Sequence, residues 1–163
     1  MKKTEKNDEF FMKKALKQAK KAFNNEDVPV GAVVVCDEKI VGCGYNKKEK
    51  TKCSLYHAEI EAIQKACKNV GDWRLCDCTL YVTLEQSVMC AVAIMNHRIK
   101  RVVIGVTEPN FGACGSGIDI LNNEKLNTKT EVITGILKDE CLNMLQTFFK
   151  NRREFNKSGK SDI

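Results

Sequence analysis

Two kinds of apolar pattern alternate along the chain. In residues 9–23 apolar side chains recur every three or four positions, which predicts a helix that ends at Asn24-Asn25. Continuous apolar runs then cover residues 28–36 and 40–45, and the polar residues 37–39 separate them. A short polar break between two apolar runs is typical of a turn, so the sequence predicts a β-hairpin here.

The alternation of helical stripes and apolar runs continues to the end of the chain. Further helices are predicted at about 57–69, at 87–97 and from residue 137 onward. Strands are predicted at 79–83, 101–106 and 131–135. Alternating helices and strands are typical of a single sheet covered on both sides. The fold class expected is therefore α/β, as a three-layer α/β/α sandwich around one mixed five-stranded sheet.

The length and the absence of a repeat or an internal linker indicate one domain. The chain has 163 residues, which is enough to bury a substantial core. We expect a loose N-terminus at 1–8, a domain at 9–155 and a loose C-terminal tail at 156–163. Trp73 is expected to be an anchor of the core.

Charge and cysteine content narrow the classes of protein to consider. The net charge is +6, with lysines concentrated near the N-terminus, in residues 46–52 and near the C-terminus, and such basic segments suit a polyanionic partner. No apolar run approaches the ~20 residues of a membrane span, and the basic N-terminus does not resemble a signal peptide. We therefore expect a cytoplasmic protein with no membrane partner. The nine cysteines are odd in number and scattered, unlike a disulfide framework.

The candidate chemistry lies at the starts of two predicted helices. His57 and Glu59 fall in the first turn of one helix, and Cys90 falls at the start of the next, three residues after Ser87. A catalytic zinc site typically has three protein ligands and one open position. His57, Cys90 and a second cysteine in the place of Ser87 would provide such a set. A zinc ion lowers the pKa of its water to ~7, and Glu59 could then transfer the proton. The helix dipole is expected to favour a thiolate at Cys90.

These residues and their surroundings resemble the cytidine/deoxycytidylate deaminase superfamily, which pairs H-x-E with P-C-x-x-C. The match is best with the bacterial tRNA adenosine deaminases and covers roughly residues 9–155. The segments that carry it are DVPVGAVVV at 27–35, HAE at 57–59, GDWRLCDCTLYVTLE at 71–85, RIKRVVIG at 98–105, GACGS at 112–116 and TGILKDECLNMLQTFFKNRR at 134–153. The last segment is typical of the tRNA enzymes rather than of deaminases that act on free bases.

The resemblance implies a cytidine-deaminase-like fold and hydrolytic deamination of adenosine to inosine at the wobble position of a tRNA anticodon. It implies one zinc ion per subunit, held by His57 and Cys90, and a zinc-bound hydroxide as the nucleophile. Glu59 would be the proton shuttle, and Asn46 and Glu108 would bind the substrate. The partners implied are the tRNA anticodon stem-loop and a second copy of the chain in a homodimer.

The departures from the family pattern cluster around the expected zinc site. They are Gln86-Ser87 in place of Pro-Cys, Ser54-Leu55-Tyr56 in place of Pro-Thr-Ala, Val92 in place of glycine and Glu108 in place of aspartate. A serine hydroxyl is not a usual zinc ligand, so Ser87 removes one expected thiolate. Three interpretations are open: an enzyme with a weakened site, a binding or dimerisation partner that has lost activity, and a Cys→Ser variant. Cys53, on the loop that leads to His57, is a candidate replacement ligand.

Overall fold

The computed structural model describes residues 3–158 and contains one mixed five-stranded sheet. The helices are α1 (Lys3–Asn24), α2 (Lys48–Thr51), α3 (Ala58–Val70), α4 (Val88–Asn96) and α5 (Lys138–Ser158), with a 3₁₀ turn, η1, at Glu124–Leu126. The strands are β1 (Gly31–Cys36), β2 (Lys39–Tyr45), β3 (Cys78–Leu84), β4 (Arg101–Val106) and β5 (Glu131–Thr134). Their order is β2-β1-β3-β4-β5, with antiparallel pairing from β2 to β3 and parallel pairing from β3 to β5. The predicted fold class is confirmed.

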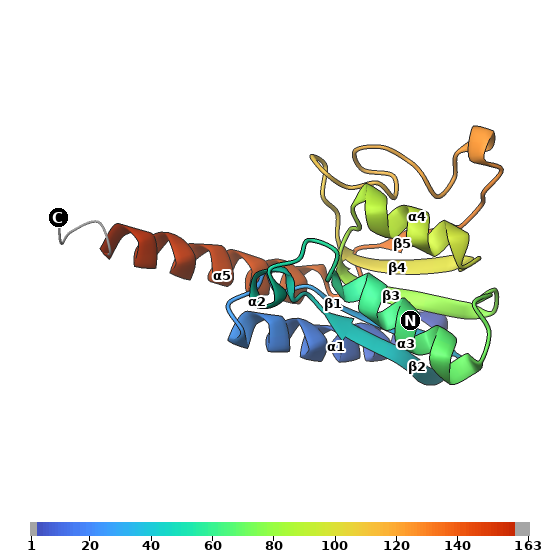
Figure 1. Ribbon diagram of the computed structural model, residues 1–163, viewed down its shortest axis with the longest axis horizontal. Helices are drawn as coiled ribbons and strands as arrows, with labels where there is room; N and C mark the ends of the chain where they lie inside the picture. Colours follow the sequence, from blue (N-terminus) through green and yellow to red (C-terminus); the bar gives the residue numbers. More distant parts are fainter. Residues whose placement is uncertain (1–2, 159–163) are drawn as a thin grey trace.

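The alternation of side chains along β1 divides the core between the two faces of the sheet. Val33 and Val35 pack with residues of α1, β3 and β4 and with Cys141 of α5. Ala32 and Val34 point to the opposite face and pack with α3 and α4. Successive strand side chains point to opposite faces, so one buried strand contributes to both clusters. The result is a layer of helices on each side of the sheet (Figure 1).

Two glycines of β2 allow α3 to lie very close to the sheet. A Cβ atom at Gly44 would overlap the carbonyl oxygen of Ala58, and one at Gly42 would overlap that of Ala62. Both approaches are far closer than van der Waals contact, so neither position has room for a side chain. Ala58 opens α3, and this close packing therefore positions the helix start at His57.

Both ends of the described chain are more regular than the sequence pattern predicted. Residues 3–8 are helical in α1 and residues 156–158 are helical in α5, although both were expected to be loose. Residues 1–2 and 159–163 lie outside the described residues. No helix of the described part is long and apolar enough to span a membrane. All nine cysteines are free thiols.

A buried ionic network holds α1 against the sheet. Asp8 is 3% exposed, and its carboxylate accepts hydrogen bonds from both Nη atoms of Arg101, at 3.0 and 2.8 Å. The Tyr81 hydroxyl also donates to Asp8, at 2.9 Å. Burial raises the pKa of Tyr81 above its ordinary value, and the Asp8 carboxylate adds to the shift. The network joins α1, β3 and β4.

We expect Asp8→Asn to lower the free energy of unfolding by about 2 kcal/mol, because it leaves the Arg101 guanidinium without its buried carboxylate partner. The cost is moderated because the Arg101 side chain is 21% exposed and can reach water. Urea denaturation measures the change. Glu131→Gln is the matched control, since Glu131 also contacts Arg101 but is 59% exposed, and it should cost less than ~0.5 kcal/mol. Equal effects of the two substitutions would contradict a dominant role for Asp8.

Candidate metal and catalytic site

The first half of the site comes from the start of α3. His57 is the N-cap residue, with extended backbone angles, and Glu59 lies in the first turn. Ala58, Ala62 and Ala66 form the small-residue face that packs on the sheet, while Glu59 and Glu61 are favoured near the positive end of the helix dipole. Gly71, in the left-handed conformation, ends the helix.

The second half comes from the start of α4, directly after β3. Ser87 is the N-cap residue of α4, and Cys90 lies in its first turn. Cys90 is fully buried. Because α3 and α4 cover the same face of the sheet, their first turns can meet. A contact between α3 and α4 is what brings the two segments together, although they are separated by β3 in the sequence.

The structure brings together the three residues that the sequence pattern singled out. The Cys90 Sγ lies 3.4 Å from the His57 Nδ1. One donor atom from each of His57, Glu59 and Cys90 lies within 4.8 Å of the others. Glu59 is 3% exposed, so its carboxylate is buried beside the imidazole and the thiol. This cluster is the candidate site.

Burial controls the protonation of the cluster. Burial, with a contribution from Lys48, lowers the pKa of His57, which favours the neutral imidazole that binds metals. Burial raises the pKa of Glu59 to about 7. Burial and the Glu59 carboxylate raise the pKa of the Cys90 thiol. Desolvation of the buried thiol thus outweighs the helix dipole, and the expectation that the dipole would favour a thiolate is wrong.

Ser87 is the N-cap residue of α4, but its side chain does not form the usual capping hydrogen bond. An N-cap serine normally accepts a hydrogen bond from a backbone N–H of the first turn, but Ser87 makes no side-chain cap. Its Oγ is buried beside the Cys90 thiol and makes no well-formed hydrogen bond among the described residues. The neighbouring Gln86 is fully buried, and its Nε2 is likewise unpaired within residues 3–158. Unpaired buried polar atoms are rare, so these two mark the part of the site that departs from the family pattern.

The donor set fits a zinc ion in part. The imidazole nitrogen of His57 and the sulfur of Cys90 are donors that zinc binds, and their separation of 3.4 Å allows one ion to contact both. Ser87 supplies only a neutral hydroxyl where a second thiolate would stand. Cys53, the candidate replacement, is not in the metal-binding cluster found among the described residues. The residues present therefore fit a zinc ion with two strong ligands and lack the second thiolate.

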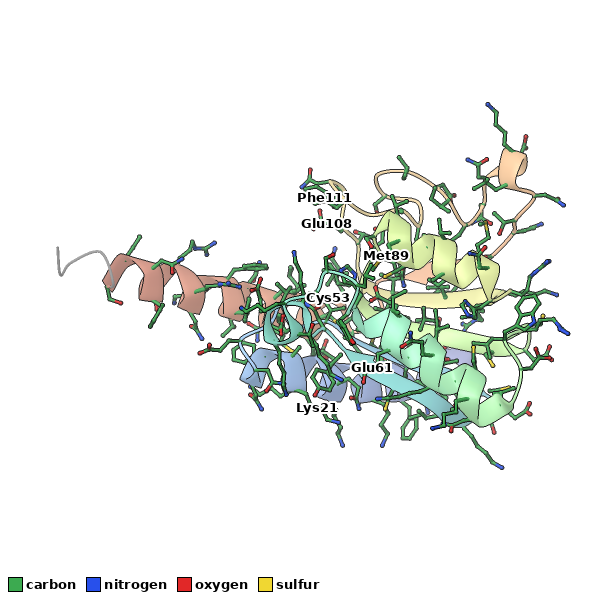
Figure 2. The ribbon with its side chains drawn as sticks, viewed as in Figure 1. Lys21, Cys53, Glu61, Met89, Glu108 and Phe111 are labelled. Carbon is green, nitrogen blue, oxygen red and sulfur yellow. The ribbon has the colours of Figure 1, made fainter. Side chains whose placement is uncertain are left out.

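The two residues expected to bind substrate lie on the loops that follow β2 and β4. Asn46 is 9% exposed; its Nδ2 donates to the Val28 carbonyl, and its Oδ1 accepts from the backbone of Lys48. The side chain thus fixes the loop that contains α2. Glu108 is half-buried, on the loop after β4, and accepts a hydrogen bond from the backbone of Asn110. Figure 2 shows Glu108 with Phe111 on this loop and Cys53 on the loop before α3.

The structure identifies Glu85 as an organising residue that the sequence pattern did not single out. Its carboxylate accepts hydrogen bonds from the backbone N–H groups of Glu108, Cys114 and Ser116, at 2.9–3.1 Å. Burial alone would raise its pKa, but the hydrogen bonds from Ser116, Glu108 and Cys114 hold the pKa below its ordinary value. Glu85 therefore shapes the loop at 107–117, which follows β4. Its place directly after a strand, next to Gln86, was the only sequence signal.

We expect Glu85→Gln to lower the free energy of unfolding by about 2 kcal/mol at neutral pH, because the new amide faces an N–H donor. Since the folded pKa is depressed, the carboxylate stabilises the fold above the ordinary pKa of ~4.3, and this contribution is lost as pH falls through the folded value. The difference between the variant and the unaltered protein should therefore shrink in acid. Urea denaturation across pH measures it, with the exposed Glu154→Gln as control. A pH-independent difference would contradict the assignment.

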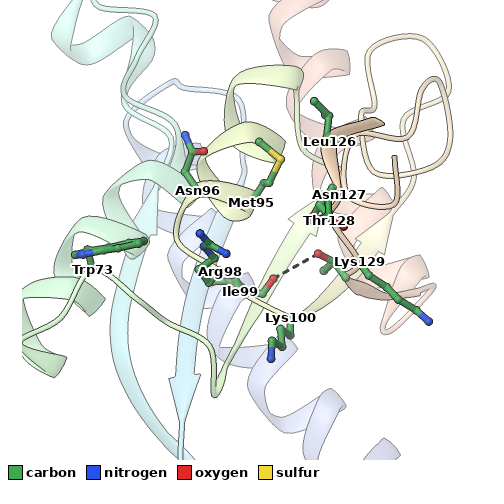
Figure 3. Close-up of a pocket in the computed structure, with 11 residues that line it drawn as sticks. Trp73, Met95, Asn96, Arg98, Ile99, Lys100, Leu126, Asn127, Thr128 and Lys129 are labelled. Atoms are coloured by element: carbon green, nitrogen blue, oxygen red, sulfur yellow. Dashed lines mark hydrogen bonds between the residues drawn. The ribbon is translucent and has the colours of Figure 1, made fainter. Parts of the chain in front are cut away.

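A hollow of about 460 Å³ lies at the other end of α4, away from Cys90. Figure 3 shows its lining, which includes Trp73, Met95, Arg98 and Lys129. Trp73 is 51% exposed and stacks with the guanidinium of Arg74, whose centre lies 4.8 Å from the ring centroid. The expectation that Trp73 anchors the core is therefore wrong, since its apolar ring packs with a cation at the surface.

Comparisons with known proteins identify the family of this chain. The model of the MafB19-like deaminase family matches residues 6–153. A tRNA-specific adenosine deaminase from Bacillus subtilis (strain 168) is 41% identical, over 96% of this chain and 97% of that protein. One from Haemophilus influenzae (strain ATCC 51907 / DSM 11121 / KW20 / Rd) is 43% identical, over 94% and 90%. A solved structure from studies of A-to-I editing by tRNA:A34 deaminases has a TM-score of 0.79 and 35% identity, covering 83% of this chain and 99% of that one. Its sequence and its fold together show that the chain belongs to the family of tRNA-specific adenosine deaminases.

Proposed function

We propose that this chain hydrolytically deaminates adenosine to inosine at the wobble position of a tRNA anticodon. The observation that carries the proposal is the buried cluster of His57, Glu59 and Cys90, with donor atoms within 4.8 Å of one another. It is supported by family membership over nearly the whole chain. We further propose that the active domain comprises residues 9–155, close to the span of the family match at 6–153.

His57 and Cys90 would hold one zinc ion per subunit. Bound zinc would supply a nucleophile at neutral pH, because it lowers the pKa of a coordinated water. The reaction forms a C–O bond at C6 and breaks the C–N bond to the amino group. Glu59 would take up the two protons of the attacking water in turn, and would deliver one to the purine ring nitrogen and the other to the amino group, which leaves as ammonia. The carboxylate is 3% exposed, so bulk water has little access to the proton that it carries. Asn46 and Glu108 are proposed to bind the substrate.

A second function is favoured by one specific observation. The Ser87 hydroxyl, which makes no well-formed hydrogen bond within the described residues, stands where the family pattern has a ligand cysteine. If two ligands hold zinc too weakly for turnover, the chain would act as an RNA-binding or dimerisation partner with the deaminase fold. The two functions share the fold and the RNA surface, and they differ only in whether the cluster turns over substrate.

Product analysis on defined RNAs tests the proposal. We expect the zinc-supplemented protein to form inosine in an anticodon stem-loop with adenosine at the wobble position, and to leave the same RNA unchanged when that adenosine is replaced by guanosine. Free guanine and free cytosine should not be deaminated. Deamination of a free base, with no inosine in the RNA, would overturn the proposed substrate. RNA binding without inosine would favour the second function.

The surface proposed to bind RNA lies between α1, α2 and α5. A groove of about 780 Å³ there is lined by aromatic, amide and basic side chains, among them Phe148, Phe155, Lys50, Lys52 and Arg152, and by two carboxylates, Glu26 and Glu49. Phe155 is 77% exposed, on the part of α5 that extends beyond the sheet (Figure 1). Exposed aromatic rings stack with bases, and basic side chains contact phosphates. The anticodon stem-loop is the partner proposed for this groove.

We expect the affinity for the stem-loop to fall steeply as salt rises, since each phosphate that a lysine or arginine neutralises releases counterions. Lys50→Ala or Lys52→Ala should each remove one such ion pair and make the slope of log K against log salt less negative by about 0.7–0.9. Fluorescence anisotropy titrations at several salt concentrations measure it. Lys68→Ala is the control, because Lys68 is exposed on α3 and does not line the groove. Binding that does not depend on salt would contradict phosphate contacts by these lysines.

We also propose that the protein is a cytoplasmic homodimer. Large apolar side chains are exposed on the loop before α3, at the start of α4 and on the loop after β4, including Leu55, Tyr56, Val88 and Phe111, which are 48–79% exposed. A second copy of the chain would cover such apolar surface. Light scattering should then give twice the monomer mass of 18.4 kDa. A mass of 18.4 kDa at micromolar concentration would contradict the dimer.

A further inference from the structure

The metal-binding cluster of this site contains a single cysteine, Cys90, where the family pattern has two. Ser87 replaces the second cysteine of the family pattern, and its hydroxyl is buried and makes no well-formed hydrogen bond among the described residues. Structural and catalytic zinc ions in proteins have at least three protein ligands. Some other group must complete the set if this chain is to hold the ion.

The described residues offer few candidates for a third ligand. Cys53 is not in the metal-binding cluster. The Cys114 thiol is not in it either and donates to the Oε1 of Gln86, at 2.9 Å. The carboxylate of Glu59 is the remaining donor, and it lies within 4.8 Å of both the Nδ1 or Nε2 of His57 and the Sγ of Cys90.

Charge balance in the resting site, with neutral water as the fourth ligand, favours the same group. A neutral imidazole and two thiolates neutralise Zn²⁺, whereas an imidazole, one thiolate and a serine hydroxyl leave one uncompensated positive charge. That charge would be buried, because Cys90 is fully buried and Glu59 is 3% exposed, and an unpaired buried charge is costly. A carboxylate restores neutrality, and carboxylate oxygen is an ordinary zinc ligand.

We propose that Glu59 is the third zinc ligand of this chain, replacing the missing thiolate. The proposal rests on the proposed function for the identity of the metal. One carboxylate oxygen would bind the ion and leave the other free to carry a proton, so Glu59 would have two tasks that compete. The expected consequence is a protein that keeps zinc but transfers protons less efficiently than its relatives with two cysteines.

The test is a four-protein cycle of metal affinity, measured without RNA. Zinc dissociation constants from chelator competition are compared for the unaltered protein, Glu59→Gln, Ser87→Cys and the double variant. With Ser87 present, Glu59→Gln should weaken zinc binding by at least about 10-fold. This factor is the lower end of the loss in metal affinity that follows when a group supporting a metal site is removed. In the Ser87→Cys background, Glu59→Gln should change the affinity by a much smaller factor, about 2-fold or less. Glu61→Gln is the matched control, because Glu61 lies on the same helix but pairs with Lys47 and Lys65.

Cobalt absorption gives a second measurement that does not depend on turnover. The thiolate-to-cobalt band of the unaltered protein should have the intensity of one thiolate, and Ser87→Cys should double it. Circular dichroism controls for folding. An unchanged zinc affinity in Glu59→Gln would overturn the inference, even if the protein forms inosine. If the cycle behaves as expected but no inosine forms, the proposed function fails and the ligand assignment stands.

Discussion

Replacing Ser87 by cysteine is expected to raise the rate of inosine formation by about 100-fold. The substitution restores the thiolate of the family pattern, and it releases Glu59 from the metal for proton transfer, which is worth about 10²–10⁴-fold in typical enzymes. The position can accept a thiol, because Ser87 Oγ is already buried and makes no well-formed hydrogen bond in the described part of the chain. Single-turnover assays on the stem-loop, at saturating zinc, measure the change.

Two controls separate this effect from a general improvement of the protein. Ser87→Ala removes the hydroxyl without adding a ligand and should not raise the rate. Ser87→Cys should leave RNA affinity unchanged, because Ser87 lies at the start of α4 and does not line the groove between α1, α2 and α5. A rate that stays unchanged in Ser87→Cys, with zinc bound, would contradict the role assigned to the missing ligand.

Glu59→Gln is expected to lower inosine formation by about 1,000-fold in the Ser87→Cys background, where zinc occupancy no longer depends on Glu59. The amide has nearly the same shape as the carboxylate but cannot accept and donate the proton. The fold should be retained, since the carboxylate is not part of the network of Asp8, Tyr81 and Arg101 that holds α1. RNA affinity should also be retained. A loss of less than about 10-fold would mean that another group transfers the proton.

The three residues of the cluster could be singled out from their places at two predicted helix starts, and the family resemblance supplied the roles expected of them. His57 and Glu59 lie within one helical turn, and Cys90 lies in the first turn of the next helix after a strand. Such features depend on local structure, which the apolar pattern predicts well. The layers of the fold followed from the same pattern, because alternating helices and strands leave few arrangements of one sheet.

The features that escaped prediction depend on contacts between distant parts of the chain. Residues 3–8 are all polar, yet they are helical, and Asp8 at their end pairs with Arg101, 93 positions further along the chain. Glu85 accepts hydrogen bonds from three backbone N–H groups of the loop at 107–117. In the sequence, α4 and β4 separate Glu85 from this loop. The protonation of Cys90 follows from complete burial, which no local pattern shows.

The loss of one thiolate from a deaminase site is the property of this chain that most needs a direct test. The most direct measurement is the rate of inosine formation at the wobble position, for the unaltered protein and for Ser87→Cys, with the zinc content of each sample determined in parallel. We predict slow, zinc-dependent inosine formation by the unaltered protein and about 100-fold faster formation by the variant. Equal rates, with one tightly held zinc in both proteins, would contradict a site weakened by Ser87.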